Sequence, residues 1–291
     1  MNDTNLSLET VINRRKELIR NKLWDCLTTD NLEAWATQFQ TDSDERIATI
    51  ALDALIVRTK SSAKAAMWHF LCSVVPEIIN DSSCWNEFGV IPYDLLREFK
   101  FNLRILRLER SESSFGSGQS SDDLIRLLRE EFCVHENYFL EPDPESHIIL
   151  LDEISGSGNQ AVDAIQTWQD HLNSNYRDMS VYFLALHRRG YKAITTKKAE
   201  IRLFFSEILG DETSLAKLII ENELANDISE AHEIITDFTE RNFIKDEWKR
   251  LGYKEMAICY KPAFTACNNM AGLYLSRTRD TNVRLFERGL G

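Results

Sequence analysis

The stretch H-I-I-L-L-D-E-I-S-G-S-G-N-Q, residues 147–160, decides the fold that we expect for this chain. Its four consecutive branched apolar residues have the length and composition of a strand that is buried on both faces. Asp152 and Glu153 would then stand at the carboxyl end of that strand. The small residues 156–158 can turn the chain sharply and expose backbone N–H groups, before apolar periodicity at residues 161–172 indicates a helix. The stretch therefore predicts a strand, an anion-binding turn and a helix in succession.

Strand-like and helix-like segments alternate around this stretch. The other expected strands are residues 101–106 and 181–186, and another expected helix is residues 124–132. Strands that alternate with helices pair in parallel and are covered on both faces. We therefore expect an α/β fold with an open parallel sheet, in which ligands collect outside the carboxyl ends of the strands.

The first third of the chain has a different pattern, because polar capping residues precede apolar residues at three-and-four spacing. We expect a helical N-terminal region over residues 1–98 and the α/β domain over residues 99–291. The helices expected outside the α/β pattern are residues 8–27, 32–39, 45–57, 63–79, 197–209, 214–224 and 229–242, and a loop is expected at residues 261–270.

Composition limits the classes of protein that this chain can be. With 291 residues and 43% hydrophobic residues, it can bury a core, so disorder is not expected. A formal net charge of -12 disfavours direct binding to nucleic acid or to anionic lipid. No segment has the length of a membrane span or the layout of a signal peptide, so we expect a cytoplasmic protein without membrane contact.

The cysteines and tryptophans are best explained by packing. No C-x-x-C pair or histidine pair at ligand spacing occurs, which argues against structural zinc, other transition metals and a disulfide framework. Each cysteine is expected to be a small apolar core residue. Trp24, Trp35 and Trp68 are expected in the core or between helices. The six cysteines are Cys26, Cys72, Cys84, Cys133, Cys259 and Cys267.

A second glycine-serine loop occurs earlier in the chain. Gly116, Ser117 and Gly118 precede a helical segment in the same way as residues 156–158 do. Two such loops could hold a ligand with phosphate groups at both ends, while carboxylates between them bind sugar hydroxyls or Mg²⁺. The alternative is that residues 111–121 form only a flexible Ser/Gly linker.

Two common phosphate-binding motifs are excluded by their defining residues. Neither glycine loop has the G-x-x-x-x-G-K-[ST] pattern, and no lysine follows Gly158 directly. The sequence G-S-G-N-Q is not G-x-G-x-x-G, and no acidic residue ends the next expected strand, as a dinucleotide site would require.

The pattern of residues 148–160 resembles the ribose-phosphate motif of type I phosphoribosyltransferases. The resemblance implies that Asp152 and Glu153 bind the ribose hydroxyls of phosphoribosyl pyrophosphate together with Mg²⁺. It also implies that the following loop wraps the 5′-phosphate. Gln160 stands where that family usually has threonine or serine, and Asn159 replaces a glycine. The residues implied in phosphate or ribose binding are Ser155, Gly156, Ser157, Gly158, Asn159 and Gln160.

More of the chain is similar to phosphoribosyltransferase-like proteins of bacterial conflict and antiphage systems. The shared features are a W-x-x-Q-F stretch at residues 35–39, the acidic and glycine loop described above, paired asparagines at residues 268–269, and L-F-x-R at residues 285–288. This resemblance implies an α/β domain of phosphoribosyltransferase-like type behind a helical region. It also implies protein partners from a defence operon.

Phosphoribosyl transfer separates a ribosyl cation from pyrophosphate, so catalysis would consist mainly of stabilising the leaving group. Arg107 and Arg110 are candidates for that role, beside Asp152 and Glu153. His187 and Arg188 follow the strand at residues 181–186, and they either face the acceptor substrate or only open a turn.

Three functions are consistent with these residues. The first is a phosphoribosyltransferase-like effector or sensor that binds phosphoribosyl pyrophosphate or a nucleotide. The second is a regulatory subunit that retains the fold without turnover and binds a partner protein or a nucleoprotein complex. The third is an unrelated α/β hydrolase or phosphatase, which is disfavoured because no serine elbow, metal-ligand histidines or cysteine-phosphate loop occurs.

Overall fold

The computed structural model describes residues 6–79, 92–109, 120–173, 175–243, 251–264, 270–279 and 283–286. The chain divides into two compact units, one of residues 1–59 and 209–289 and one of residues 60–208 and 290–291. The region expected to be helical, residues 1–98, is therefore divided between the two units. None of the helices in the described ranges combines the length and the apolar character needed to cross a membrane.

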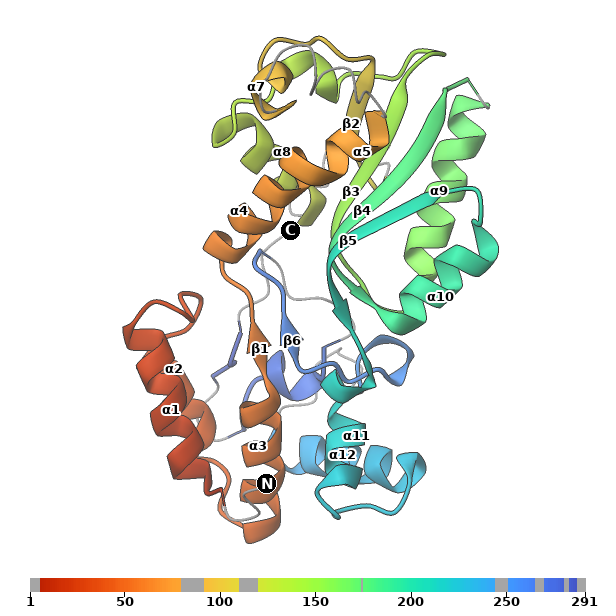
Figure 1. The fold of residues 1–291 in the computed structure, drawn as a ribbon. Helices are drawn as coiled ribbons and strands as arrows, with labels where there is room; N and C mark the ends of the chain where they lie inside the picture. Colours follow the sequence, from red (N-terminus) through yellow and green to blue (C-terminus); the bar gives the residue numbers. More distant parts are fainter. Residues whose placement is uncertain are drawn as a thin grey trace. The chain divides into compact units, whose positions relative to one another are not determined.

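The unit of residues 60–208 is built on a four-stranded sheet with the order β2-β3-β4-β5 (Figure 1). The pairs β2-β3 and β3-β4 are parallel, and their register places Ile105 beside Ile149 and Ile149 beside Ser180. The α/β fold with a parallel sheet is thus confirmed. The strands are β2 (Leu103–Arg107), β3 (His147–Ser155), β4 (Asp178–His187) and β5 (Arg202–Leu209).

Helices cover both faces of this sheet (Figure 1). On one face, Ile148 and Leu150 pack into a buried cluster with Ile165 of α9 and Ile194 of α10. On the other face, the Tyr182 hydroxyl reaches the backbone of α4, and α8 packs on β2 and β3. The helices are α4 (Lys60–His69), a π-helical turn (Phe70–Val74), α5 (Val75–Ile79), α7 (Pro92–Leu96), α8 (Ser120–Glu130), a 3-10 turn (Glu136–Phe139), α9 (Asn159–Leu172) and α10 (Arg188–Lys197).

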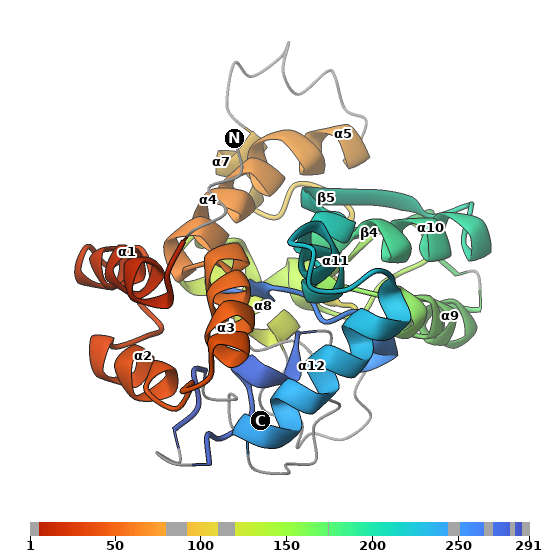
Figure 2. The same cartoon turned by 90° about the horizontal axis from the view of Figure 1, so that it is seen from below.

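The other unit is mainly helical. α1 packs beside α2 and α3, and α11 contacts α3 and α12 (Figure 2). Two short parallel strands, β1 and β6, join residues about two hundred positions apart in the sequence. The elements are α1 (Leu8–Arg20), α2 (Thr29–Ala36), α3 (Asp42–Ala54), β1 (Ile56–Val57), α11 (Leu215–Glu221), α12 (Ile228–Asn242) and β6 (Tyr260–Lys261), with 3-10 turns at Asp211–Thr213, Tyr253–Glu255 and Gly272–Tyr274.

Helix starts in this unit follow the expected capping chemistry. The side chains of Ser7, Thr28, Thr41 and Asp227 each accept a hydrogen bond from a backbone N–H in the first turn of the following helix. These bonds satisfy amides that have no partner within the helix. Trp35 is fully buried, and its ring meets Phe39 edge to face at a centroid distance of 4.8 Å, as expected for a core tryptophan.

Several expectations are wrong in detail. Residues 197–209 do not form a helix, because α10 ends at Lys197 and β5 follows; the alternation of Arg202–Leu209 suits a half-exposed strand. The helix expected over residues 45–57 ends at Ala54, since the chain then pairs with β6.

The packing of the cysteines and tryptophans also differs from the expectation at some positions. Cys26 and Cys133 are exposed instead of buried, whereas Cys259 is buried. Cys84 and Cys267 lie outside the described residues. Trp68 is 44% exposed and stacks on Phe132, while Trp24 is buried.

Candidate functional site

Strand β3 carries the acidic pair further inside the sheet than the sequence suggests. It was expected to end after its apolar run, but it continues to Ser155, because pairing with β4 persists as far as Ser155 beside Leu186. Asp152 and Glu153 therefore lie within the strand and near its carboxyl end. They do not lie in the turn that follows.

The two carboxylates belong to opposite faces of the sheet, since successive residues of a strand alternate. Asp152 is paired in register with Phe183, which packs on the face covered by α9. Its side chain is half-buried, and its Oδ1 accepts a hydrogen bond of 2.7 Å from the Glu153 backbone N–H. Glu153 shares the other face with Leu151 and is only 1% exposed. Asp152 is therefore the acid that a ligand can reach more readily.

The turn after β3 leads directly into α9. Gly158 is the residue before the helix and has a φ of 81°, a left-handed conformation that favours glycine. It supplies no side-chain cap, and no side chain within the described ranges caps the first-turn amides of α9. Ser157 and Asn159 are half-buried and Gln160 is exposed, whereas Gly156 is buried. The turn thus reaches solvent through its polar residues.

The first turn of α10 lies against this loop. A Cβ atom built on Gly190 would lie 2.7 Å from the Gly156 carbonyl oxygen. A Cβ atom on Gly158 would lie 2.9 Å from both the Gly190 backbone and the Ala193 Cβ. Both glycines are therefore required by close packing of backbone on backbone. Gly190 was not among the predicted site residues, although the run R-R-G directly after an apolar strand is a signal for such a contact.

A histidine and two arginines follow one another where β4 ends and α10 begins. The histidine is buried, and both arginines are exposed. His187 is 2% exposed and caps α10, because its Nδ1 accepts a hydrogen bond of 3.1 Å from the Arg189 backbone N–H. Arg188 and Arg189 are exposed at the first turn of α10, next to the loop of residues 156–158. His187 thus orders the first turn of α10, in which the two exposed arginines follow it.

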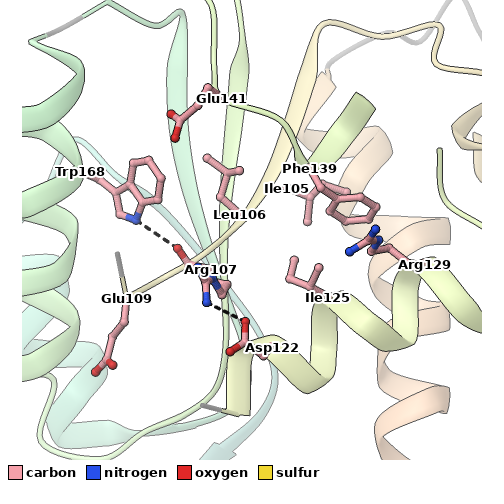
Figure 3. Close-up of a pocket in the computed structure, with 10 residues that line it drawn as sticks. All are labelled: Ile105, Leu106, Arg107, Glu109, Asp122, Ile125, Arg129, Phe139, Glu141 and Trp168. Carbon is pink, nitrogen blue, oxygen red and sulfur yellow. Dashed lines mark hydrogen bonds and ion pairs between the residues drawn. The ribbon is translucent and has the colours of Figure 1, made fainter. Parts of the chain in front are cut away.

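Arg107 ends β2, the neighbouring strand, and lies in register with Leu151. Its guanidinium donates to the Asp122 carboxylate of α8 at 2.8 Å, and it lines a cavity of about 460 Å³ along the outer edge of β2 (Figure 3). No residue of the loop at 155–160 lines this cavity. The structure therefore places Arg107 on the strand beside the acidic pair, with its charge engaged by Asp122.

The other predicted residues lie outside the described part of the chain. These are Arg110 and the second glycine loop, Gly116, Ser117 and Gly118. The helix expected after that loop is present as α8.

The donor set of the site suits magnesium better than a metal that needs several protein ligands. In the part of the chain that the structure describes, no group of three or more His, Cys, Asp or Glu residues could hold a metal ion. Magnesium binds through one or two carboxylates and shares the oxygens of a phosphorylated ligand. The half-buried Asp152 carboxylate meets that requirement, and the burial of Glu153 weighs against direct coordination by it.

Comparison with known proteins identifies a family across most of the chain. Residues 32–286 match the family model described as PRTase-CE. A solved structure titled "Structure of AQ2163 protein from Aquifex aeolicus" shares 15% identity with a TM-score of 0.22, over 25% of this chain and 33% of that one. That likeness is confined to a small part of both proteins. No curated protein matches the chain.

Proposed function

Because the chain belongs to the PRTase-CE family, which is phosphoribosyltransferase-like, we propose that it binds phosphoribosyl pyrophosphate or a related nucleotide at the turn between β3 and α9. The observation that carries this proposal is the start of α9 behind Gly158, where first-turn amides without a capping side chain follow the carboxyl end of a parallel strand. Such a helix start attracts a phosphate through its N–H groups and its dipole.

The 5′-phosphate would meet the amides of the first turn of α9 and the polar side chains of the loop. Ser157, Asn159 and Gln160 all reach solvent and can donate hydrogen bonds to phosphate oxygens. Arg188 and Arg189 add positive charge from the first turn of α10, which contacts the loop. A charge-assisted bond from an arginine to phosphate is stronger than a neutral one, so these two residues would favour a phosphate over an uncharged group.

The ribose and a magnesium ion would lie on the side of Asp152. Its carboxylate is half-buried at the end of the sheet, where ligands of parallel α/β folds collect. Magnesium, held by this carboxylate and by ligand oxygens, would supply charge neutralisation to a pyrophosphate group. Glu153 is buried in the strand and would fix the position of Asp152, while Arg107 would reach a leaving group only by exchanging its Asp122 partner.

Binding without turnover is the second candidate function. It is favoured by the burial of Glu153 and by the ion pair that engages Arg107, since both side chains would otherwise serve the transfer reaction. In that case the chain would act as a regulatory or scaffold subunit whose ligand controls a partner protein or a nucleoprotein complex. A pyrophosphate-release assay distinguishes binding without turnover from phosphoribosyl transfer. With phosphoribosyl pyrophosphate and a panel of bases and nucleosides, only an enzyme releases pyrophosphate.

Calorimetry tests the ligand. With phosphoribosyl pyrophosphate and Mg²⁺, we expect Asp152→Asn and Ser157→Asp to weaken binding at least about tenfold, or 1.4 kcal/mol, through loss of a carboxylate and through repulsion of phosphate. Asp170→Asn is the matched control, because this exposed residue lies about three turns along α9 from its start and should leave affinity unchanged. A parent protein that binds neither phosphoribosyl pyrophosphate nor ribose 5-phosphate nor a nucleoside monophosphate would refute the site.

The resemblance to conflict-system proteins supports an effector or sensor role in bacterial antiphage defence. Cells that carry this gene with its neighbours should reduce phage plating, and Asp152→Asn should abolish the reduction. Equal plating with and without the intact gene would contradict the defence role and leave the ligand site to be judged by calorimetry.

A further inference from the structure

The outer edge of β2 presents backbone groups to which no strand of the described chain pairs. β2 is the first strand in the order of the sheet, so it has β3 on one side only. The Leu108 N–H donates to the Leu151 carbonyl oxygen at 2.9 Å, which shows that even-numbered residues face β3. Since alternate residues of a parallel strand bond to one neighbour, Ile105 and Arg107 direct their peptide groups to the open edge.

Side chains close this edge at both ends and leave its middle open. The Trp168 indole N–H donates to the Arg107 carbonyl oxygen at 3.1 Å, and the Arg104 guanidinium donates to the Leu103 carbonyl oxygen at 2.9 Å. Between these two bonds lie the outward N–H and carbonyl of Ile105 and the outward N–H of Arg107. Three groups in this order match the backbone of one added strand.

A cavity of about 460 Å³ runs along the same edge, and this volume lies within the range of cavities that bury ligands. Figure 3 shows Trp168 on one side of the strand and Ile125 and Asp122 of α8 on the other. Ile105 and Phe139 add apolar surface to the lining. The edge therefore has both unpaired backbone and room for the side chains of an extended segment.

The two arginines of the lining already have carboxylate partners. Arg107 contacts Asp122 at 2.8 Å, and Arg129 contacts Glu136 at 2.7 Å. Neither guanidinium is thus the group that would select an anionic occupant.

Two further carboxylates lie at opposite ends of the cavity. Glu141 is near the start of β2, because its carbonyl oxygen accepts from the Arg104 guanidinium. Its side chain is 74% exposed, and its Oε2 lies 3.7 Å from the His171 Nε2, a longer contact than those of the two arginines. Glu109 follows the end of β2, and Figure 3 shows it at the other end of the lining. In a chain of net charge -12, these acids favour a basic occupant.

We propose that the edge of β2 is a docking site for a partner protein's extended segment that carries a basic residue on each side of an apolar centre. The segment adds as a fifth strand, its backbone bonds to Ile105 and Arg107, and its basic residues face Glu109 and Glu141. This site does not depend on the ribose-phosphate ligand.

Amide hydrogen exchange with a short peptide tests the proposal. The probe is acetyl-Lys-Val-Thr-Val-Lys-amide, and the control peptides carry proline at the centre or glutamate at both ends. On binding, exchange at the Ile105 and Arg107 amides should slow at least about tenfold, while exchange at the Leu106 amide should stay unchanged because it already faces β3. Glu141→Lys should weaken binding about fivefold, and Glu145→Lys, an equal charge change at an exposed residue outside the lining, less than about twofold.

Four results would overturn the docking site. Two concern the peptides: the basic peptide does not bind, or the glutamate peptide binds equally well. Two concern the protein without peptide: the Ile105 amide is already protected from exchange, or self-association of the chain protects the same amides. None of these readouts involves phosphoribosyl pyrophosphate, so failure here is distinct from failure of the proposed function.

Discussion

A single methyl group at Gly158 should destabilise the sheet-containing unit measurably. Alanine at a φ of 81° costs about 1 kcal/mol relative to glycine. The added Cβ would also lie 2.9 Å from the Gly190 backbone and from the Ala193 Cβ, and no side-chain rotation relieves a contact with backbone. Overpacking of this kind costs about 1 to 3 kcal/mol. We therefore expect Gly158→Ala to lower the free energy of unfolding by about 2 to 4 kcal/mol.

Two further variants separate the contributions in a urea titration followed by far-ultraviolet circular dichroism. Asparagine tolerates the left-handed conformation but adds the same Cβ, so Gly158→Asn should keep only the overpacking cost of about 1 to 3 kcal/mol. Ser157→Ala adds no atom and should stay within about 0.5 kcal/mol of the parent. A Gly158→Ala protein as stable as Ser157→Ala would show that α10 does not pack on the loop.

Three other perturbations have defined outcomes. Burial raises the pKa of Tyr182 to about 12, so between about pH 10 and 12 the unfolded state loses its proton first, and this tyrosine's contribution to stability falls by about 3 kcal/mol. Tyr182→Phe should make the fall of the urea midpoint with pH less steep than in the parent, and an unchanged slope would contradict the assignment. Trp168→Phe removes the indole N–H that donates to the two carbonyl oxygens at the end of β2, so the free energy of chemical unfolding should fall by about 1 to 2 kcal/mol. An unchanged free energy of unfolding would show that water replaces this donor. Thr41→Ala removes the acceptor for the Asp44 N–H at the start of α3 and should cost about 1 kcal/mol, whereas an unchanged melting temperature would exclude the cap.

The central part of the fold could be predicted from local sequence because each element carries its own signal. Residues 148–151 and 181–186 are apolar runs of strand length, and both form buried parallel strands. The helix at residues 161–172 has apolar periodicity, and it is present as α9. Where a strand is buried on both faces, its short continuous apolar run distinguishes it from a helix, which is longer and has apolar residues at three-and-four spacing.

Elements at the margins of the units could not be predicted in this way. β5 is half-exposed, so its apolar and polar residues mix, and the apolar positions Phe204, Phe205, Ile208 and Leu209 also suit a helix face. β1 exists only because β6 pairs with it, and that partner lies about two hundred residues away. Local propensity contains no information on such a partner, and tertiary pairing overrides it.

The candidate site shows the same division at the scale of single residues. The acids, the glycine turn and the helix after it could be recognised from their order in the sequence, whereas the contact of Gly190 with the Gly156 carbonyl could not, because it joins two separate turns. Close packing against Gly190 is thus a reason for glycines in this loop that is independent of phosphate binding. A glycine-rich turn after a strand is therefore weaker evidence for phosphate than the amides of α9 without a capping side chain, which close packing does not explain.

The extension of β3 to Ser155 changes the chemistry that an acidic pair can perform. In an irregular turn, two adjacent carboxylates can converge on one ion or one sugar. Within a strand that is still paired with β4, alternation directs Asp152 to the face of α9 and Glu153 to the opposite, buried face. A carboxylate that is 1% exposed would have to leave its own hydrogen-bonding surroundings before it could serve a ligand, which is costly in a low-dielectric interior. We therefore propose unequal roles for the pair, in which Asp152 would meet the ligand and Glu153 would fix the strand that positions it.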